Sequence, residues 1–301
     1  MHPFDLSMEV STQSLFDAQA LETYRAVGIR YLAVQPDFYD LPDKEIITCH
    51  QHLMALGFVI DTCHPPYGGG NRVNSVSAED EDIRRASVEM WKHYLKRFAL
   101  TGLRAVPMHT GGVMHSSGSL KARDRLTDTL EHILPEAEKS GVIVALENTF
   151  FENPCPFSDA PKPSGVTEKY INDDCAMLLR YVQLYNHPNL GICHDVGHSN
   201  LYGRDVETDL NILSTHTVLY HIHDNDGIAD RHWNVGDGSF PWKILLDTLS
   251  TNQYSFPLYN EVLGAKMPDV KPLLKRPDIV ASNYAQAKAA LERISHASAP
   301  I

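Results

Sequence analysis

Short apolar segments alternate with longer segments of helical periodicity eight times along this 301-residue chain. The segments expected to form strands are 4–10, 29–34, 59–64, 103–109, 142–148, 190–195, 218–224 and 257–263. Strands that alternate with helices pair in parallel through right-handed crossovers, so that all their carboxyl ends lie on one side. Eight such units in about 300 residues predict an α/β fold, a single-domain (β/α)8 TIM barrel over residues 1–301.

The helices expected between these strands carry apolar residues three and four positions apart. Ser77 is expected to cap the third helix. The core face of that helix is predicted to hold Ile83, Ala86, Met90, Tyr94 and Phe98. A doubly wound open sheet is the alternative fold, but no GxGxxG motif or phosphate-binding loop follows any strand. The proline-rich segment 150–166 is expected to be a lid, because loops of that length in compact domains usually serve a function.

Composition and charge narrow the classes of partner. The chain has no apolar run of about 18 residues, so no membrane span is expected. Five unpatterned cysteines and an N-terminus without the regions of a signal peptide predict reduced thiols and a cytoplasmic location. The net charge of -12 argues against a nucleic-acid partner, since phosphate binding favours a basic face. The sequence leaves open whether the chain forms a homo-oligomer.

Six consecutive predicted strands end in residues that can bind metals, at the edge where a barrel has its active site. These residues are His64, His109, Glu147, Asp195, His198, His223, Asp230, His232 and Glu261. A single histidine or glutamate at a strand end is more often a hydrogen-bonded or solvated residue than a ligand. Imidazoles and carboxylates are costly to bury together unless something pairs with them, so the joint pattern indicates a shared divalent cation.

Neighbouring polar residues are assigned other roles. His221 shares a face of the strand with His223 but is expected to lie deeper and to be structural. His194 is expected to point towards the helices, and Asp224 and Asp226 to support or cap loops.

The residue types constrain the metal. Glu147, Asp195, His223 and Glu261 combine one imidazole with three carboxylates, a hard anionic set suited to Mn²⁺, Mg²⁺, Co²⁺ or Zn²⁺. One ion is expected. The remaining candidate ligands would make the set rich in imidazole, which favours Zn²⁺ and allows two or three ions.

Seven short motifs carry a resemblance to a known superfamily. They are HPPY at 64–67, HTG at 109–111, ENT at 147–149, DVGH at 195–198, HDND at 223–226, DRH at 230–232 and GDG at 236–238. In this order the chain resembles the xylose isomerase-like TIM barrel superfamily over residues 29–264. That superfamily includes sugar isomerases and epimerases and the endonuclease IV-type enzymes that cleave abasic DNA.

The resemblance implies two alternative sites. In the sugar-acting members four residues hold one metal, matched here by Glu147, Asp195, His223 and Glu261. The two glutamates also act as the acid/base pair, and His198 holds substrate oxygens. In the abasic-site endonucleases nine residues hold three zinc ions, and all nine candidate ligands given above match.

Other segments favour a small-molecule substrate. The segment 35–43 is acidic and apolar, where the nucleases carry a basic, DNA-probing loop. Basic residues expected at the mouth are scattered among acids. The favoured hypothesis is therefore a metal-dependent sugar isomerase or epimerase that transfers a proton through a metal-stabilised enediolate. Glu147 and Glu261 would be catalytic, and His198 and Arg231 would bind substrate. The alternatives are a zinc phosphodiesterase acting at abasic DNA and a non-enzymatic metal- or sugar-binding module.

Overall fold

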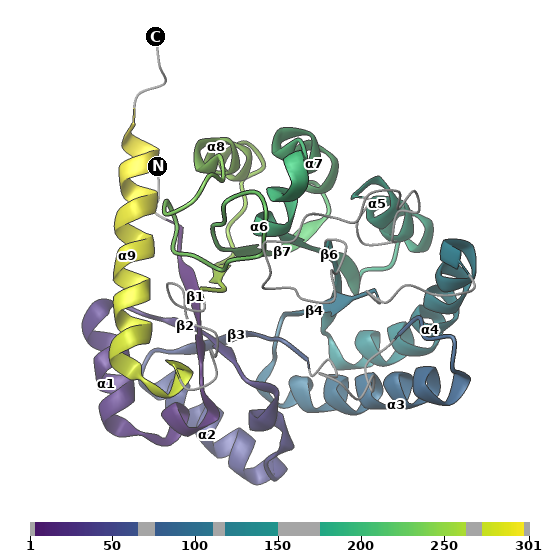
Figure 1. Ribbon diagram of the computed structural model, residues 1–301. Coiled ribbons are helices and arrows are strands. Elements are labelled where there is room, and N and C mark those ends of the chain that lie inside the picture. Colours follow the sequence, from purple (N-terminus) through teal and green to yellow (C-terminus); the bar gives the residue numbers. More distant parts are fainter. Residues whose placement is uncertain (1–3, 66–75, 111–117, 150–174, 263–272, 298–301) are drawn as a thin grey trace.

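Eight parallel strands form one curled sheet in the computed structural model, which describes residues 4–65, 76–110, 118–149, 175–262 and 273–297 (Figure 1). The strands are β1 Leu6–Val10, β2 Tyr31–Val34, β3 Val59–Cys63, β4 Ala105–His109, β5 Ile143–Glu147, β6 Leu190–Asp195, β7 Thr217–Ile222 and β8 Leu258–Asn260. Their order in the sheet is β3-β2-β1-β8-β7-β6-β5-β4. The predicted TIM barrel is confirmed, and the segment 150–166 expected to be a lid lies outside the described residues.

Helices lie around the outside of the sheet, as Figure 1 shows. The α-helices are α1 Ala18–Val27, α2 Asp43–Ala55, α3 Glu81–Phe98, α4 Gly118–Ser140, α5 Cys175–Tyr185, α6 Val196–Ser199, α7 Val206–Leu213, α8 Trp242–Thr251 and α9 Pro277–His296. Short 3-10 helices are η1 Thr12–Phe16, η2 Pro36–Asp40, η3 Ala99–Thr101, η4 Leu201–Gly203 and η5 Leu273–Lys275. In the part of the chain that the structure describes, no helix is both long and apolar enough to cross a bilayer.

The edge strands β3 and β4 approach each other through side chains. Thr62 Oγ1 donates a hydrogen bond of 2.9 Å to the carbonyl oxygen of Ala105. On its other edge, β3 pairs with β2 with a shift of register, because Leu32 pairs with Ile60 but Ala33 pairs with Thr62. One residue of β3, Asp61, is therefore extra in the ladder. Such a shift reverses which side chains face the interior from that point onward.

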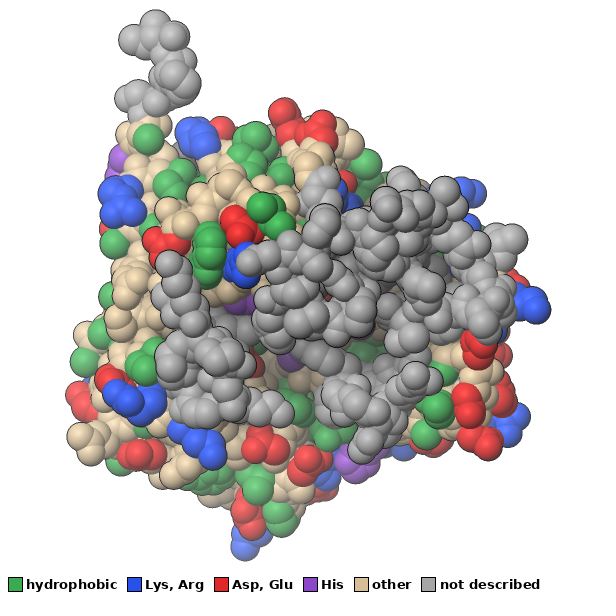
Figure 2. All heavy atoms as spheres, viewed as in Figure 1, with side chains coloured by type: hydrophobic (Ala, Val, Ile, Leu, Met, Phe, Trp, Pro, Cys, Tyr) green, Lys and Arg blue, Asp and Glu red, His purple; other side chains and the backbone are tan. Residues whose placement is uncertain are grey.

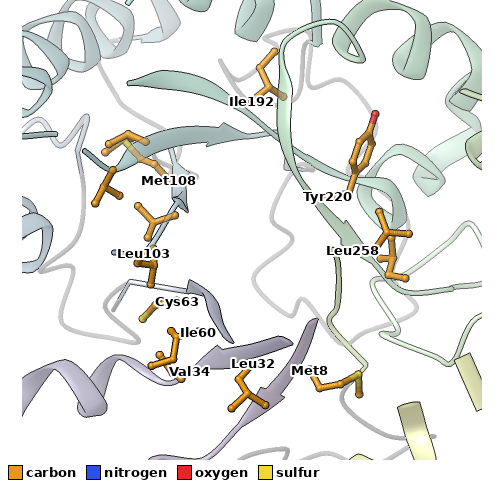
Figure 3. Packing of buried hydrophobic residues seen from close by; sticks show 14 of the residues in the cluster. Met8, Leu32, Val34, Ile60, Cys63, Leu103, Met108, Ile192, Tyr220 and Leu258 are labelled. Atoms are coloured by element: carbon orange, nitrogen blue, oxygen red, sulfur yellow. The ribbon is translucent and has the colours of Figure 1, made fainter. Parts of the chain in front are cut away.

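Apolar packing fills the space on both sides of the sheet. The larger cluster lies between the strands and the helices, and Figure 3 shows its members Leu32, Ile60, Ile192 and Tyr220 on the strands. A second cluster lies inside the barrel and contains Ala33, Ala145, Cys193, Leu219 and Tyr259. Cys193 pairs in register with Leu219, and Asp195 pairs with His221 two residues further on. Since residues two apart share a face of a strand, the inner cluster forms a layer directly beneath polar strand ends.

The expected cap of the third helix was wrong, and its expected core face was right only in part. Asp80, and not Ser77, caps α3, because its side chain accepts hydrogen bonds from the backbone N–H groups of Asp82 and Ile83. Ser77 instead donates to the carbonyl of Thr110 at 2.8 Å. Of the predicted core face, Tyr94 and Phe98 are buried, Ile83 and Met90 are half-buried and Ala86 is exposed. The buried face of α3 consists of Arg84, Ser87, Val88, Trp91, Tyr94, Leu95 and Phe98.

Candidate metal centre

Three carboxylates converge on one imidazole at the carboxyl ends of neighbouring strands. Nδ1 of His221 lies 3.4 Å from Oε1 of Glu147, 3.9 Å from Oδ2 of Asp195 and 3.1 Å from Oε2 of Glu261. Glu147 ends β5, Asp195 ends β6, His221 lies in β7 and Glu261 follows β8. Adjacent parallel strands deliver their ends at one height, so these four side chains meet without any long connection.

Two further histidines face Glu147 from the other side. Nε2 of His109 lies 3.1 Å from Oε2 of Glu147, and Nε2 of His64 lies 3.8 Å from the same oxygen. The His64 and His109 rings meet edge to face at 5.3 Å. His64, His109 and Glu147 therefore form a donor group adjacent to that of His221.

A third group surrounds Asp230. Nε2 of His232 lies 2.9 Å from Oδ2 of Asp230, and Nε2 of His198 lies 3.6 Å from that oxygen. Nε2 of His223 lies 3.5 Å from Oδ1 of Asp230 and 3.1 Å from Oδ1 of Asp195. The rings of His223 and His232 stack with centroids 4.0 Å apart. Asp195 thus lies between this group and His221. All nine residues proposed as ligands from the sequence lie within one continuous network.

The imidazole expected among the three carboxylates was His223. In the structure Nδ1 of His221 faces all three carboxylates, and Nε2 of His223 lies 3.1 Å from one of them, Oδ1 of Asp195. β7 ends at Ile222, and its register with β6 sets His221 beside Asp195. His223 follows the strand and lies between Asp195 and Asp230. His221, expected to be deeper and structural, thus lies beside three of the predicted ligands, because the strand ends two residues earlier than expected.

Buried atoms without hydrogen bonds show that these residues fit a cation. Both ring nitrogens of His221 and of His223 are buried and make no well-aligned hydrogen bond, although carboxylate oxygens lie 3.1 Å away. Oδ2 of Asp195 and Oδ1 of Asp230 are also buried without one. Buried polar atoms rarely remain unpaired, and ligands to a shared ion are one physical explanation. The donor set, imidazole nitrogens with carboxylates, suits Mn²⁺ or Zn²⁺.

The protonation of the imidazoles follows from their surroundings. Burial lowers the pKa of His64 to about 4, so at neutral pH it is neutral, as a ligand must be. Burial also opposes the charging of His198, but Asp195 and Asp230 outweigh it and raise its pKa to about 10. The same balance of burial against Asp230 raises the pKa of His232 to about 10. Protons on these rings compensate the buried carboxylates where no cation does so.

Backbone groups orient the ligands. The His198 ring contacts the carbonyl of Asn148 through Nδ1 at 2.8 Å, and the His232 ring contacts the carbonyl of Glu261 through Nδ1 at 2.7 Å. Each contact assigns the proton to Nδ1 and turns Nε2 towards Asp230. The Asn148 side chain in turn holds the backbone of Asp195, accepting from its N–H at 2.7 Å and donating to its carbonyl at 2.8 Å.

Asp224 fixes the loop that carries Asp230 and His232. Its carboxylate is buried and accepts hydrogen bonds from the backbone N–H groups of Gly236 and Phe240 and from Nε1 of Trp242. The role in loop support expected for Asp224 agrees with these bonds.

Arg231 and His194 lie beside the network. Asp226 binds the guanidinium of Arg231, with Nε 3.1 Å from Oδ2, at the edge of the same loop. His194 is buried, and its Nε2 lies 2.9 Å from the hydroxyl of Ser199.

Glu9 is an ionisable residue at the mouth that was not predicted from the sequence. Glu9 lies on β1, and Gln35, which follows β2, donates a side-chain hydrogen bond to it. Burial, together with the charge of Glu261, raises the pKa of Glu9 to about 7. The strand β1 alternates Ser7 with Glu9 on one face, a polar pattern inside a barrel that could have drawn attention to it.

Comparison with known proteins agrees with this architecture. The family model described as "Xylose isomerase-like TIM barrel" matches residues 17–292. The chain belongs to the xylose isomerase-like TIM barrel family. Among curated family relatives, the L-ribulose-5-phosphate 3-epimerase UlaE of Escherichia coli O1:K1 is 20% identical over 213 residues, covering 70% of this chain and 69% of that protein.

Solved structures share the family fold. A D-psicose 3-epimerase from Clostridium cellulolyticum H10, solved with D-tagatose, matches with a TM-score of 0.71 and 14% identity over 97% of this chain and 98% of that one. The 3-keto-D-glucoside 4-epimerase YcjR of Escherichia coli matches with a TM-score of 0.67 and 15% identity over 93% and 99%.

Proposed function

We propose that the protein is a metal-dependent isomerase or epimerase of a sugar or sugar derivative. The observation that carries the proposal is the convergence of Glu147 and Glu261 on the same nitrogen of His221, beside Asp195. Two carboxylates that face one point can act as a proton-transfer pair on a molecule bound there. The names of the relatives support the class of reaction, because the three proteins described above are sugar epimerases.

One divalent ion, Mn²⁺ or Zn²⁺, is proposed to be held by Glu147, Asp195, His221 and Glu261. When bound, such an ion supplies Lewis-acid polarisation of the substrate carbonyl and stabilises the negative charge of the enediolate. His223, proposed from the sequence as the imidazole of this set, is then a partner of Asp195 that holds its second oxygen.

The protein's own groups move the proton. One glutamate removes the proton from the carbon that carries a hydroxyl group next to the carbonyl, and the other glutamate returns a proton. Return to the opposite face of the same carbon gives an epimer, and return to the neighbouring carbon gives an isomer. Glu147 is almost fully buried and lies against His109, whereas the Glu261 side chain is 12% exposed. His198 and Arg231 are proposed to orient substrate hydroxyl groups.

Substitution of the two glutamates tests this mechanism. We expect Glu147→Gln and Glu261→Gln each to abolish the exchange of solvent deuterium into the product, because each variant lacks one proton carrier. Glu292→Gln, on the exposed surface of α9, is the matched control and should exchange like the wild type. Metal content is measured in parallel by elemental analysis. Full exchange in both site variants would refute the assignment.

A zinc phosphodiesterase acting at abasic DNA is the second candidate. The gathering of His64 and His109 on Glu147, and of His198 and His232 on Asp230, favours it, because it provides donors for additional ions. Figure 2 shows acidic and basic side chains interspersed over the part of the surface where side chains are coloured, and the net charge of -12 does not favour a nucleic-acid partner. Three zinc ions per chain with cleavage of an abasic duplex would establish the nuclease in place of the isomerase.

A further inference from the structure

Glu9 is a carboxyl at the barrel mouth that is not part of the donor groups described above. Met8 pairs in register with Asn260, so Glu9, the next residue of β1, stands at the height of Glu261 beyond β8. Ser7, two residues earlier on the same face, is buried in the barrel interior. Glu9 is half-buried, whereas Glu147 is almost fully buried. Its side chain is therefore accessible next to the catalytic carboxylates.

Two neutral side chains hold Glu9 in place. The amide of Gln35 donates to Oε1 of Glu9, and the hydroxyl of Tyr259 hydrogen-bonds the same carboxyl. Gln35 precedes η2 but makes no capping bond with its side chain. Its amide is thus directed to Glu9. The charged groups that act on Glu9 include Glu261, which disfavours a second negative charge, and His232.

This environment is suited to a hydroxyl group and unsuited to a phosphate. The carboxyl of Glu9 is half-buried at the mouth, and its oxygens can accept hydrogen bonds from a hydroxyl group bound there. A phosphate next to it would meet two carboxylates of like charge in a partly buried site, which is strongly unfavourable. A polar group built to bind a hydroxyl also rejects ligands that leave it unpaired.

We propose that Glu9 determines the substrate class: its carboxyl hydrogen-bonds a hydroxyl of an unphosphorylated ketose and excludes a phosphate group from the β1–β2 side of the mouth. The inference rests on the proposed function. It selects between two kinds of substrate that the names of relatives contain, L-ribulose 5-phosphate on one side and the free sugars D-psicose and D-tagatose on the other.

Calorimetric binding to the Mn²⁺-loaded protein tests the inference without requiring turnover. The probes are L-ribulose with L-ribulose 5-phosphate, and D-fructose with D-fructose 6-phosphate. We expect the wild type to prefer each free sugar. Glu9→Gln should lower the ratio of the dissociation constants of the phosphorylated and the free sugar by at least about tenfold. The amide still forms a hydrogen bond but no longer repels the phosphate. Glu9→Ala should weaken binding of the free sugar by about tenfold, because a hydrogen bond to a carboxyl is lost.

A structural role of Glu9 is distinguished by a second variant and a second readout. The Tyr259 ring packs edge-on against His221, with the ring centroids 4.7 Å apart. The alternative is therefore that Glu9 merely positions Tyr259 and has no contact with the substrate. Tyr259→Phe removes the hydroxyl but leaves the carboxyl of Glu9 and its hydrogen bond from Gln35, so we expect it to keep the preference for free sugars and the affinity for Mn²⁺. A preference lost equally in Tyr259→Phe, or unchanged in Glu9→Gln, would overturn the inference, as would a wild type that binds neither sugar. Intact preference without turnover would instead refute only the proposed reaction.

Discussion

The barrel floor contains a buried carboxylate whose removal should stabilise the protein in a pH-dependent way. Asp61, the extra residue of β3, is 5% exposed, and its Oδ2 makes no hydrogen bond. The nearest cation is Arg104, whose Nη2 lies 3.8 Å from Oδ1. Arg104 also donates to the carbonyl of Val218 at 2.6 Å and packs over the Phe256 ring. Burial therefore outweighs the attraction of Arg104 and raises the pKa of Asp61 from 3.8 to about 6.

The size and sign of the effect follow from that difference. Well below pH 3.8 Asp61 is protonated in the folded and unfolded chains alike, so it does not lower the free energy of unfolding. As the pH rises, the unfolded chain ionises first, and the folded chain loses stability until the pH passes about 6. The whole loss is about 3 kcal/mol, since one pKa unit corresponds to about 1.4 kcal/mol. Asp61→Asn cannot ionise and escapes this loss.

Urea unfolding of the metal-free proteins between pH 4 and pH 8 measures the effect. We expect the two chains to be similar in stability near pH 4 and Asp61→Asn to be the more stable by about 3 kcal/mol at pH 8. Asp247→Asn, which removes a surface carboxylate paired with Lys243, is the control and should show a much smaller change. A stability difference for Asp61→Asn that stays flat or falls with pH would show that the carboxylate is well paired and the reasoning mistaken.

Three further substitutions probe the site. His221→Ala should lower the affinity for Mn²⁺ by more than about 100-fold in a calorimetric titration, beyond the effect usual for residues that only support a ligand. Gly197→Ala should lower metal content, measured by elemental analysis, because the added Cβ would lie 1.9 Å from Cε1 of His223. Asp224→Asn should destabilise the chain by about 2–4 kcal/mol in urea unfolding, because one oxygen that accepts from Gly236 and Trp242 is lost.

The sequence predicted the barrel well because its signals are repetitive. Each strand is a short apolar segment, and each expected strand overlaps an observed one. Helix α3 shows where such patterns mislead. Its buried face includes Arg84, which pairs with Glu81 and Asp128, and Trp91, which lies one position from the expected Met90. Apolar spacing alone does not reveal that an arginine is buried by partners from its own helix and from α4.

The candidate site was predicted as a set of residues but not in its internal order. All nine proposed ligands gather, because parallel strands bring their ends to one edge. Which of the two histidines faces Glu147, Asp195 and Glu261 together depends on where β7 ends and on its register with β6, and residue spacing reveals neither. Glu9 was not predicted for a similar reason. A lone glutamate in an apolar strand resembles a surface charge until it is known which face of the strand points into the barrel.

Charge balance explains why this network is suited to exchanging protons for a cation. Four carboxylates lie together in the network: Glu147, Asp195, Asp230 and Glu261. Buried carboxylates of this kind require compensation, and in the structure the neighbouring imidazoles provide it. Despite burial, nearby groups raise the pKa of four rings: Glu147 raises that of His109, Asp195 that of His198, Cys193 and then Glu147 that of His221, and Asp230 that of His232. A divalent ion supplies the same positive charge as two of these protons, and its ligands must give up theirs to bind it. The arrangement thus retains its buried carboxylates with or without the ion, because protons and metal compensate the same charges.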